Sequence, residues 1–219
     1  MLDLAAEYVP YYAQRAGEKE RARQVGWRDL EAQHARFEQF VRALRHPADA
    51  RFHVADVGCG LGDLLPFLRM KGYNGFRYTG YDILPEMVAA AAAGHADPGA
   101  SFERIESVRD ISETDYCFAS GIFNAKGGRS DEIWWEHVRA CIGEMAGKSA
   151  CSAAFNMLSS YSDKEKQDPS LYYADPCRVF DWCKREITPD VALLHDYGQW
   201  DFTIVLRMDP ASPGGGRAS

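Results

Sequence analysis

The chain has 219 residues, 46% of them hydrophobic, and a formal net charge of −7 at pH 7 with neutral histidines. That length suits one α/β domain with additions. The acidic balance disfavours nucleic-acid binding, no apolar run is long enough to span a membrane, and the first residues lack the basic region of a signal peptide. We therefore expect a cytoplasmic protein without membrane or nucleic-acid partners.

The six cysteines include no C-x-x-C pair, and several lie in apolar strand or helix patterns. They are typical of reduced, buried thiols rather than of a disulfide or zinc framework. We therefore expect neither disulfides nor a metal site. The cysteines are Cys59, Cys117, Cys141, Cys151, Cys177 and Cys183.

Residues 1–50 precede the first core strand, and we expect them to form a helical cap on the sheet. The segment from Glu18 to Leu44 is charged, with an apolar side typical of a helix that packs on a core. His46 and Pro47 end this predicted helix.

The next stretch predicts a strand, a glycine loop and a helix. An apolar run over 52–57 indicates a buried parallel strand. Gly58, Gly60 and Gly62 follow, and glycine lets a backbone approach a ligand closely and adopt positive φ without strain. The start of the helix predicted over 64–71 adds free N–H groups and partial positive charge beside this loop.

A second strand is predicted over 77–82, and it ends in an acid, Asp82. The acid follows the last loop glycine, Gly62, by about 20 residues. In a βαβ unit this spacing places the carboxylate beside the glycine loop, where it can accept hydrogen bonds from both hydroxyls of a ribose.

The segments 54–63 and 78–82 resemble motifs I and II of the class I S-adenosylmethionine (SAM)-dependent methyltransferases, and 83–87 resembles the start of the following helix. The loop spacing is G-x-G-x-G, not the G-x-G-x-x-G of dinucleotide dehydrogenases. Asp56 precedes the loop at the end of the strand, where a dehydrogenase normally keeps the chain apolar beside a pyrophosphate. A zwitterionic methionine tail tolerates an acid there.

The resemblance implies an α/β fold: a seven-stranded Rossmann-like sheet with helices on both faces and a closing antiparallel hairpin. It also implies the cofactor SAM and its product S-adenosylhomocysteine (SAH). Carried over position by position, the residues implied to bind the cofactor are Asp56, Gly58, Cys59, Gly60, Asp82, Ile83, Glu106, Ser120 and Gly121. Glu106 departs from the aspartate more common at that position, and a solvated surface glutamate is the alternative.

The remaining elements alternate as such a sheet requires. Strands are predicted over 101–105, from Asp115, over 149–155, 191–195 and 202–208, and helices from Pro85 to Gly94, over 131–145 and over 178–186. We therefore divide the chain into the cap (1–50), a SAM-binding domain (51–208) with a substrate-side insertion at 156–176, and a disordered Gly/Pro/Ser-rich tail (209–219).

The tips of the later strands predict a substrate cavity, because ligands bind outside the carboxyl ends of strands in open α/β sheets. Its predicted lining is aromatic and suits a modest small molecule. The lining residues are Phe123, Asn124, Tyr161, Tyr172, Tyr173 and Tyr197. His195 is the histidine at a predicted strand tip on this side and is our candidate general base, and a histidine bonded within the hairpin is the alternative.

The family's helical N-terminal segments imply two further roles for the cap. Its lid residues would be Tyr8, Tyr11, Tyr12 and Arg15. Gln33 and Arg36 face one way at i, i+3 and would reach the methionine carboxylate. For each of these residues, packing of the cap on the sheet is the alternative.

The sequence thus predicts a SAM-dependent methyltransferase that moves a methyl group to an O, N or C nucleophile of a small molecule. Two alternatives stay open at this point. One is an NAD(P)-dependent oxidoreductase on a related sheet, and the other is a catalytically silent SAM-binding protein.

Overall fold

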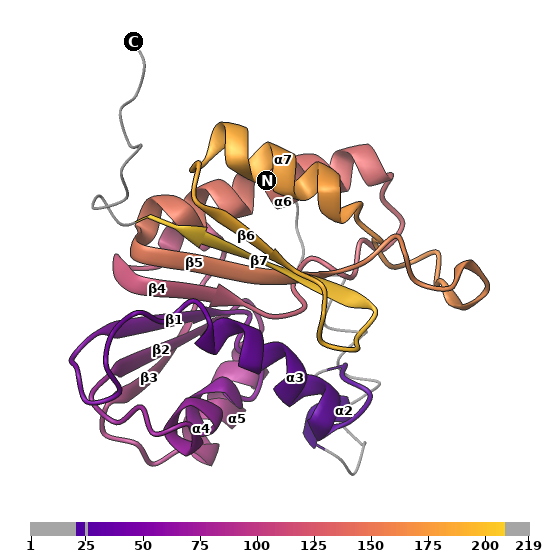
Figure 1. Ribbon diagram of the computed structural model, residues 1–219. Coiled ribbons are helices and arrows are strands. Elements are labelled where there is room, and N and C mark those ends of the chain that lie inside the picture. The colour runs from indigo at the N-terminus through magenta and orange to yellow at the C-terminus, as the bar shows by residue number, and fades with distance from the viewer. Residues whose placement is uncertain (1–20, 25, 209–219) are drawn as a thin grey trace.

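The computed structural model describes residues 21–24 and 26–208. The predicted lid residues Tyr8, Tyr11, Tyr12 and Arg15 and the predicted disordered tail lie outside the described residues. Within the described part, one seven-stranded sheet has the order β3-β2-β1-β4-β5-β7-β6 (Figure 1). The strands are β1 (His53–Val57), β2 (Arg77–Asp82), β3 (Ala100–Arg104), β4 (Thr114–Ala119), β5 (Ser149–Leu158), β6 (Val191–Leu194) and β7 (Asp201–Arg207).

Strands β1 to β5 pair in parallel, and β7 pairs antiparallel with both β5 and β6. This arrangement confirms the predicted class I methyltransferase sheet with its closing antiparallel hairpin. The central strand β1 is buried from Val54 to Val57, because it lies between β2 and β4 and helices cover both faces.

Helices cover both faces of the sheet (Figure 1). One face carries α3 (Leu30–Val41), α4 (Leu64–Met70) and α5 (Pro85–Gly94), and the other carries α6 (Asp131–Lys148) and α7 (Pro176–Glu186). The first face encloses a core rich in aromatic rings, in which Phe40 of α3 stacks on Phe118 of β4 at 5.0 Å between ring centroids. On the second face, Trp134 of α6 is fully buried and donates its indole N–H to the carbonyl of Phe123.

The N-terminal segment differs from the single helix predicted between Glu18 and Leu44. It forms a short helix, α2 (Arg21–Gln24), and then α3. Gly26 turns the chain between them with φ +88°, and the carboxylate of Asp29 caps α3 by accepting the N–H of Ala32. The break has a local cause, because a glycine at positive φ and an aspartate N-cap each favour a helix boundary.

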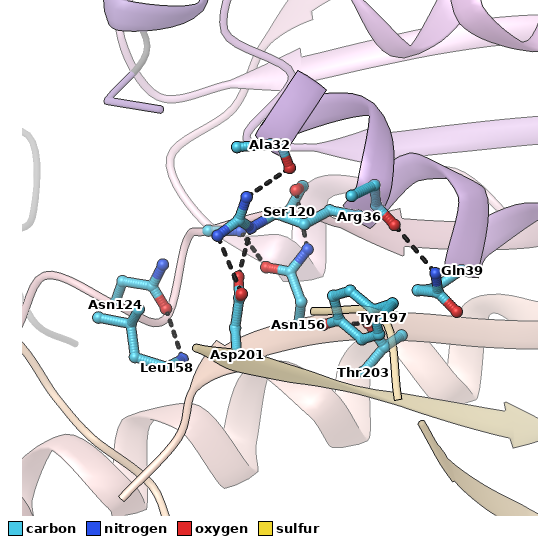
Figure 2. A network of polar contacts seen from close by, with 12 residues as sticks. Ala32, Arg36, Gln39, Ser120, Asn124, Asn156, Leu158, Tyr197, Asp201 and Thr203 are labelled. Atoms are coloured by element: carbon cyan, nitrogen blue, oxygen red, sulfur yellow. Dashed lines mark hydrogen bonds and ion pairs between the residues drawn. The ribbon is translucent and has the colours of Figure 1, made fainter. Parts of the chain in front are cut away.

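A buried ion pair joins α3 to the start of β7 (Figure 2). Arg36 of α3 binds both carboxylate oxygens of Asp201 at the start of β7, with Nη2 2.9 Å from Oδ1. It also donates to the carbonyl of Ala32, and its guanidinium lies 4.3 Å from the ring centroid of Trp27. Burial raises the pKa of Asp201, and Arg36 opposes that shift.

Backbone contacts hold the segment between β5 and α7, which the sequence predicted as an insertion over 156–176. Its first residues extend β5 to Leu158, and the 3-10 helix η2 (Lys164–Lys166) lies in its middle. Single β-bridges join Ser159 to Ala174 and Ala125 to Leu171. The segment is therefore tied to the exit of β4 as well as to its own strand.

All six cysteines are free; four are buried, Cys151 is half-buried and Cys177 is exposed, which departs from the expectation of uniformly buried thiols. No helix among the described residues is long and apolar enough to cross a membrane. A further 3-10 helix, η1 (Val108–Asp110), follows β3.

The Arg36–Asp201 pair yields a stability prediction. Arg36→Met keeps most of the side-chain volume but leaves the Asp201 carboxylate buried without its cation, so we expect a loss of about 3–5 kcal/mol in the free energy of unfolding. The matched control is Arg42→Met, because Arg42 is half-exposed and its partners are the exposed carboxylate of Asp196 and the amide oxygen of Gln39. Urea unfolding followed by circular dichroism measures both, and equal losses in the two variants would contradict this account.

Candidate functional site

A cavity opens at the carboxyl ends of β1, β2 and β4. All nine residues that the family motifs implied to bind the cofactor line it: Asp56, Gly58, Cys59, Gly60, Asp82, Ile83, Glu106, Ser120 and Gly121. The structure therefore brings together residues that are spread over more than 60 positions of the chain. Its other lining residues are Trp27, Gln33, Phe37, Val57, Leu84, Met87, Ile105, Ser107, Val108, Ile122, Ala125, His137 and Cys141.

The glycine loop is held against the end of β2 by backbone hydrogen bonds. The N–H groups of Gly58 and Cys59 both donate to the carbonyl of Tyr81, at 2.8 and 2.9 Å. Gly58 and Gly60 have φ of +69° and +53°, which L side chains rarely adopt. A Cβ on Gly58 would also lie 2.2 Å from Cγ2 of Ile122, so the loop has room only for glycine there.

Asp82 connects the glycine loop to the next helix. Its Oδ2 accepts the N–H of Gly60 at 2.9 Å, and its Oδ1 accepts the N–H of Leu84 at 3.0 Å. The residue is only 8% exposed, and burial raises the pKa of its carboxyl against the effect of these N–H groups. The carboxylate is thus fixed at the cavity wall, and each oxygen retains a lone pair that can accept from a ligand.

Asp56 is a second buried carboxyl in the cavity wall. Tyr78 donates its hydroxyl to Oδ2 of Asp56 at 2.6 Å. Burial raises the pKa of Asp56 to about 7, the Tyr78 hydrogen bond opposes the shift, and Asp82 and Asp63 add to it by repulsion. A positive charge in the cavity would favour the ionised form of this carboxyl.

The exit of β4 is held by Asn156, which the sequence analysis had placed only in the insertion. Its Oδ1 accepts the N–H of Gly121 and its Nδ2 donates to the Ser120 hydroxyl, both at 2.9 Å (Figure 2). Gly121 has φ +83°, and a Cβ there would lie 2.9 Å from the Trp27 ring. Trp27 therefore lies directly against the strand tip, where only a glycine leaves it room.

The cavity runs along the carboxyl ends of the strands, from the face that α3 covers to the face that α6 covers. Gln33 and Phe37 of α3 line it on one face, and His137 and Cys141 of α6 line it on the other. The α6 end is largely apolar because Ile105, Val108 and Ile122 also line the cavity, the first two after β3. The α3 end holds Gln33 close to the acid Asp63, with 3.3 Å between Gln33 Nε2 and Oδ2.

His137 and Cys141 are lining residues that the sequence analysis did not select. They lie one helical turn apart on α6, with 3.5 Å between Cys141 Sγ and His137 Nε2. Burial lowers the pKa of His137 and raises the pKa of Cys141 to about 12, so both are neutral at pH 7. Their i, i+4 spacing was visible in the sequence, but which face of the helix meets the cavity was not.

Two of the predicted substrate residues are wrong. Phe123 and Tyr172 are 1% and 5% exposed and lie in the core under α6 and α7. Phe123 packs edge-on against Phe155 at 5.5 Å between centroids. The sequence placed Phe123 at the exit of one strand and Tyr172 in the insertion after the next, but the chain at each point turns the side chain into the interior.

The other predicted substrate residues lie outside this cavity as well. Tyr161 and His195 are exposed neighbours, with ring centroids 6.1 Å apart, and Tyr173 accepts the N–H of Asp168 within the insertion. Tyr197 shares a hydrogen bond with Thr203 on β7, and the Oδ1 of Asn124 accepts the N–H of Leu158 (Figure 2). Within the described part of the chain, the motif-derived cofactor residues thus meet in one cavity, and none of the predicted substrate residues lines it.

The two cap residues that we expected at a methionine carboxylate separate in the structure. Arg36 forms an ion pair with Asp201 and does not line the cavity, so the prediction that it reaches the methionine carboxylate is wrong. Gln33 does line the cavity and is 2% exposed. Within residues 21–24 and 26–208, no group of three or more His, Cys, Asp or Glu side chains is placed to hold a metal ion.

Comparison with known proteins places this geometry in context. No family model matches the chain. Rv1506c of Mycobacterium tuberculosis (strain H37Rv), which is named as a candidate methyltransferase, is 45% identical over 156 residues, 71% of this chain and 93% of the relative.

Solved structures show the same fold at low identity. Magnesium protoporphyrin IX methyltransferase (ChlM) of Synechocystis PCC 6803, solved with SAH, has a TM-score of 0.62 and 12% identity over 92% of this chain and 99% of its own. A SAM-dependent methyltransferase of Aquifex aeolicus has a TM-score of 0.56 and 13% identity over 90% and 98%. Human N-acetylserotonin methyltransferase in complex with SAM has a TM-score of 0.57 and 15% identity over 92% and 66%.

The raised pKa of Asp56 gives a pH prediction. Its folded pKa of about 7 exceeds the value of 3.8 for an exposed carboxyl, so the folded state prefers the protonated form. Below about pH 4 Asp56 is protonated in the folded and the unfolded state alike. As the pH rises to about 7 the carboxyl ionises only in the unfolded state, so the free energy of unfolding of the wild type falls over this range. We expect Asp56→Asn, which keeps an oxygen for the Tyr78 hydroxyl, to gain stability relative to wild type between pH 5 and pH 8. Urea unfolding at both pH values measures the difference, and a constant difference would contradict the prediction.

Proposed function

The chain belongs to the class I SAM-dependent methyltransferases, and from this premise we propose that it binds SAM in the cavity at the ends of β1, β2 and β4 and transfers the methyl group to an O, N or C nucleophile of a small molecule. The observation that carries the proposal is the convergence of all nine predicted cofactor residues on one cavity. SAM would supply the reactive methyl carbon itself.

The two ends of the cavity suit the two ends of the cofactor. The α6 end, with Ile105, Val108 and Ile122, provides apolar surfaces for a flat adenine ring. Asp82 in the middle offers two fixed acceptors to the ribose hydroxyls. The α3 end offers polar groups, Asp56 and Gln33, to the amino-acid tail.

The protein's part in the transfer is to position the reactants and exclude water. Methyl transfer from a sulfonium is an in-line displacement, so the acceptor atom must be held on the line of the bond that breaks. Trp27 lies against Gly121 at the strand tip and lines the cavity, so its ring would shield this side of the site from solvent. Asn156 would keep Ser120 and Gly121 in place under it.

The small-molecule part of the proposal has support from the names of structural neighbours, which act on magnesium protoporphyrin IX and on N-acetylserotonin. The formal charge of −7 also argues against a nucleic-acid substrate. His195 is exposed and outside the cavity, and His137 would lie at the adenine end, so we leave both out of the proposed chemistry. We further propose a cytoplasmic location, since all six cysteines are free.

Asp82 gives the direct test of cofactor binding. Asp82→Ala would remove the charge-assisted hydrogen bonds to the ribose, each worth roughly 1.5–3 kcal/mol, so we expect SAH affinity to fall about a hundredfold or more. Calorimetric titration with SAH measures the loss, and circular dichroism checks the fold. Wild-type affinity in this variant would mean that the ribose does not contact Asp82.

Turnover gives the test of activity. We expect transfer of a tritiated methyl group from SAM to at least one member of a small-molecule library, and Asp82→Ala should reduce that transfer in proportion to its loss of SAM affinity at low SAM concentration. SAH binding without transfer to any acceptor would favour a catalytically silent SAM-binding protein instead.

A further inference from the structure

Gln33 lines the cavity, and its buried amide oxygen, Oε1, has no hydrogen-bond partner among the described residues. The side chain extends from α3 into the cavity and is 2% exposed. A buried amide oxygen is normally hydrogen-bonded, so an unpaired one in a cavity wall points to a ligand that donates to it.

The orientation of the amide is fixed by its neighbour. Gln33 Nε2 lies 3.3 Å from Oδ2 of Asp63. An ionised carboxylate only accepts hydrogen bonds, so the amide must turn its NH₂ group to Asp63, and its oxygen faces away from that carboxylate. Gln33 therefore presents an acceptor, and it cannot serve a carboxylate in this orientation.

The charges around this end of the cavity favour a cation. Asp56 lines the cavity, and Asp63 lies behind Gln33. Neither lysine nor arginine is among the described residues that line the cavity, because Arg36, the nearest candidate from α3, is bound to Asp201. An acceptor oxygen amid carboxylates complements an ammonium group and repels an anion.

We propose that Oε1 of Gln33 accepts a hydrogen bond from the ammonium group of the cofactor's methionine tail. The inference rests on the proposed function, since it assigns one contact within the SAM site. It changes the expectation from the sequence, which paired Gln33 with the carboxylate of the same tail. Gln33 is thus a residue that selects ligands with a charged amino group over ligands that lack one.

The test compares SAH with its des-amino analogue, in which hydrogen replaces the ammonium group and the carboxylate is kept. We expect Gln33→Met, which has a similar volume and no amide, to weaken SAH binding about tenfold or more and to leave the analogue within about twofold of its wild-type affinity. Calorimetry measures both ligands. Gln33→Ala, read in the same way, replaces this variant if Gln33→Met does not fold.

Gln39→Met is the matched control. Gln39 lies on the same helix and is 5% exposed, but its amide is satisfied within the cap: Nε2 donates to the carbonyl of Ala35 (Figure 2), and Oε1 accepts from Nη1 of Arg42. It does not line the cavity, so both ligands should keep their wild-type affinities in this variant.

Each other outcome has a distinct meaning. An equal loss for both ligands in Gln33→Met would overturn the inference, because Gln33 would then act on packing or on the carboxylate. Unchanged SAH affinity would overturn it as well. If the wild-type chain bound neither ligand, the proposed SAM site itself would fall, and that result is separate from any effect of Gln33.

Discussion

The candidate site depends on the attachment of the glycine loop to the end of β2. Two N–H groups of the loop, from Gly58 and Cys59, converge on the carbonyl of Tyr81, and the third, from Gly60, donates to Asp82. These three bonds join consecutive strands of the sheet at their carboxyl ends. They leave the loop with positive φ angles that only glycine adopts without strain, and they fix the carboxylate that faces the cavity. One small set of backbone contacts therefore sets both the shape and the charge of the site.

The structure buries three carboxylates, and each of them is stabilised by a different kind of group. Asp82 is stabilised by backbone N–H groups, Asp201 by the guanidinium of Arg36, and Asp56 by a single tyrosine hydroxyl. Burial raises the pKa of Asp56 to about 7, and the hydrogen bond from Tyr78 opposes only part of that shift. A cation in the cavity would stabilise the ionised form of Asp56, so under the proposed function the cost of burying this carboxyl becomes part of ligand recognition.

The sequence could predict residues that meet in one cavity because their positions follow from local structure. Gly58, Gly60 and Asp82 belong to one βαβ unit, in which the strand order and the loop geometry leave little freedom. The predictions for Phe123 and Tyr172 were wrong because a place in a cavity also depends on the direction of the side chain. Phe123 follows a strand end as expected, yet its ring points into the core under Trp134, and no local pattern distinguishes that case from a ring in the cavity. The break in the cap at Gly26 was visible in principle, since glycine and the Asp29 N-cap both mark a helix boundary.

The distant contact between Arg36 and Asp201 shows why the cap could not be interpreted from its own sequence. Spacing on the helix placed Gln33 and Arg36 on one side, and both could have faced a ligand. Asp201 begins β7, 165 residues later in the chain, and its buried carboxylate requires the guanidinium as a partner. The pair turns Arg36 toward the hairpin and fixes the rotation of α3 about its axis. Gln33, one turn earlier, is thereby held over the glycine loop with its amide toward Asp63. Arg36 thus attaches α3 to the sheet, and Gln33 forms part of the cavity wall.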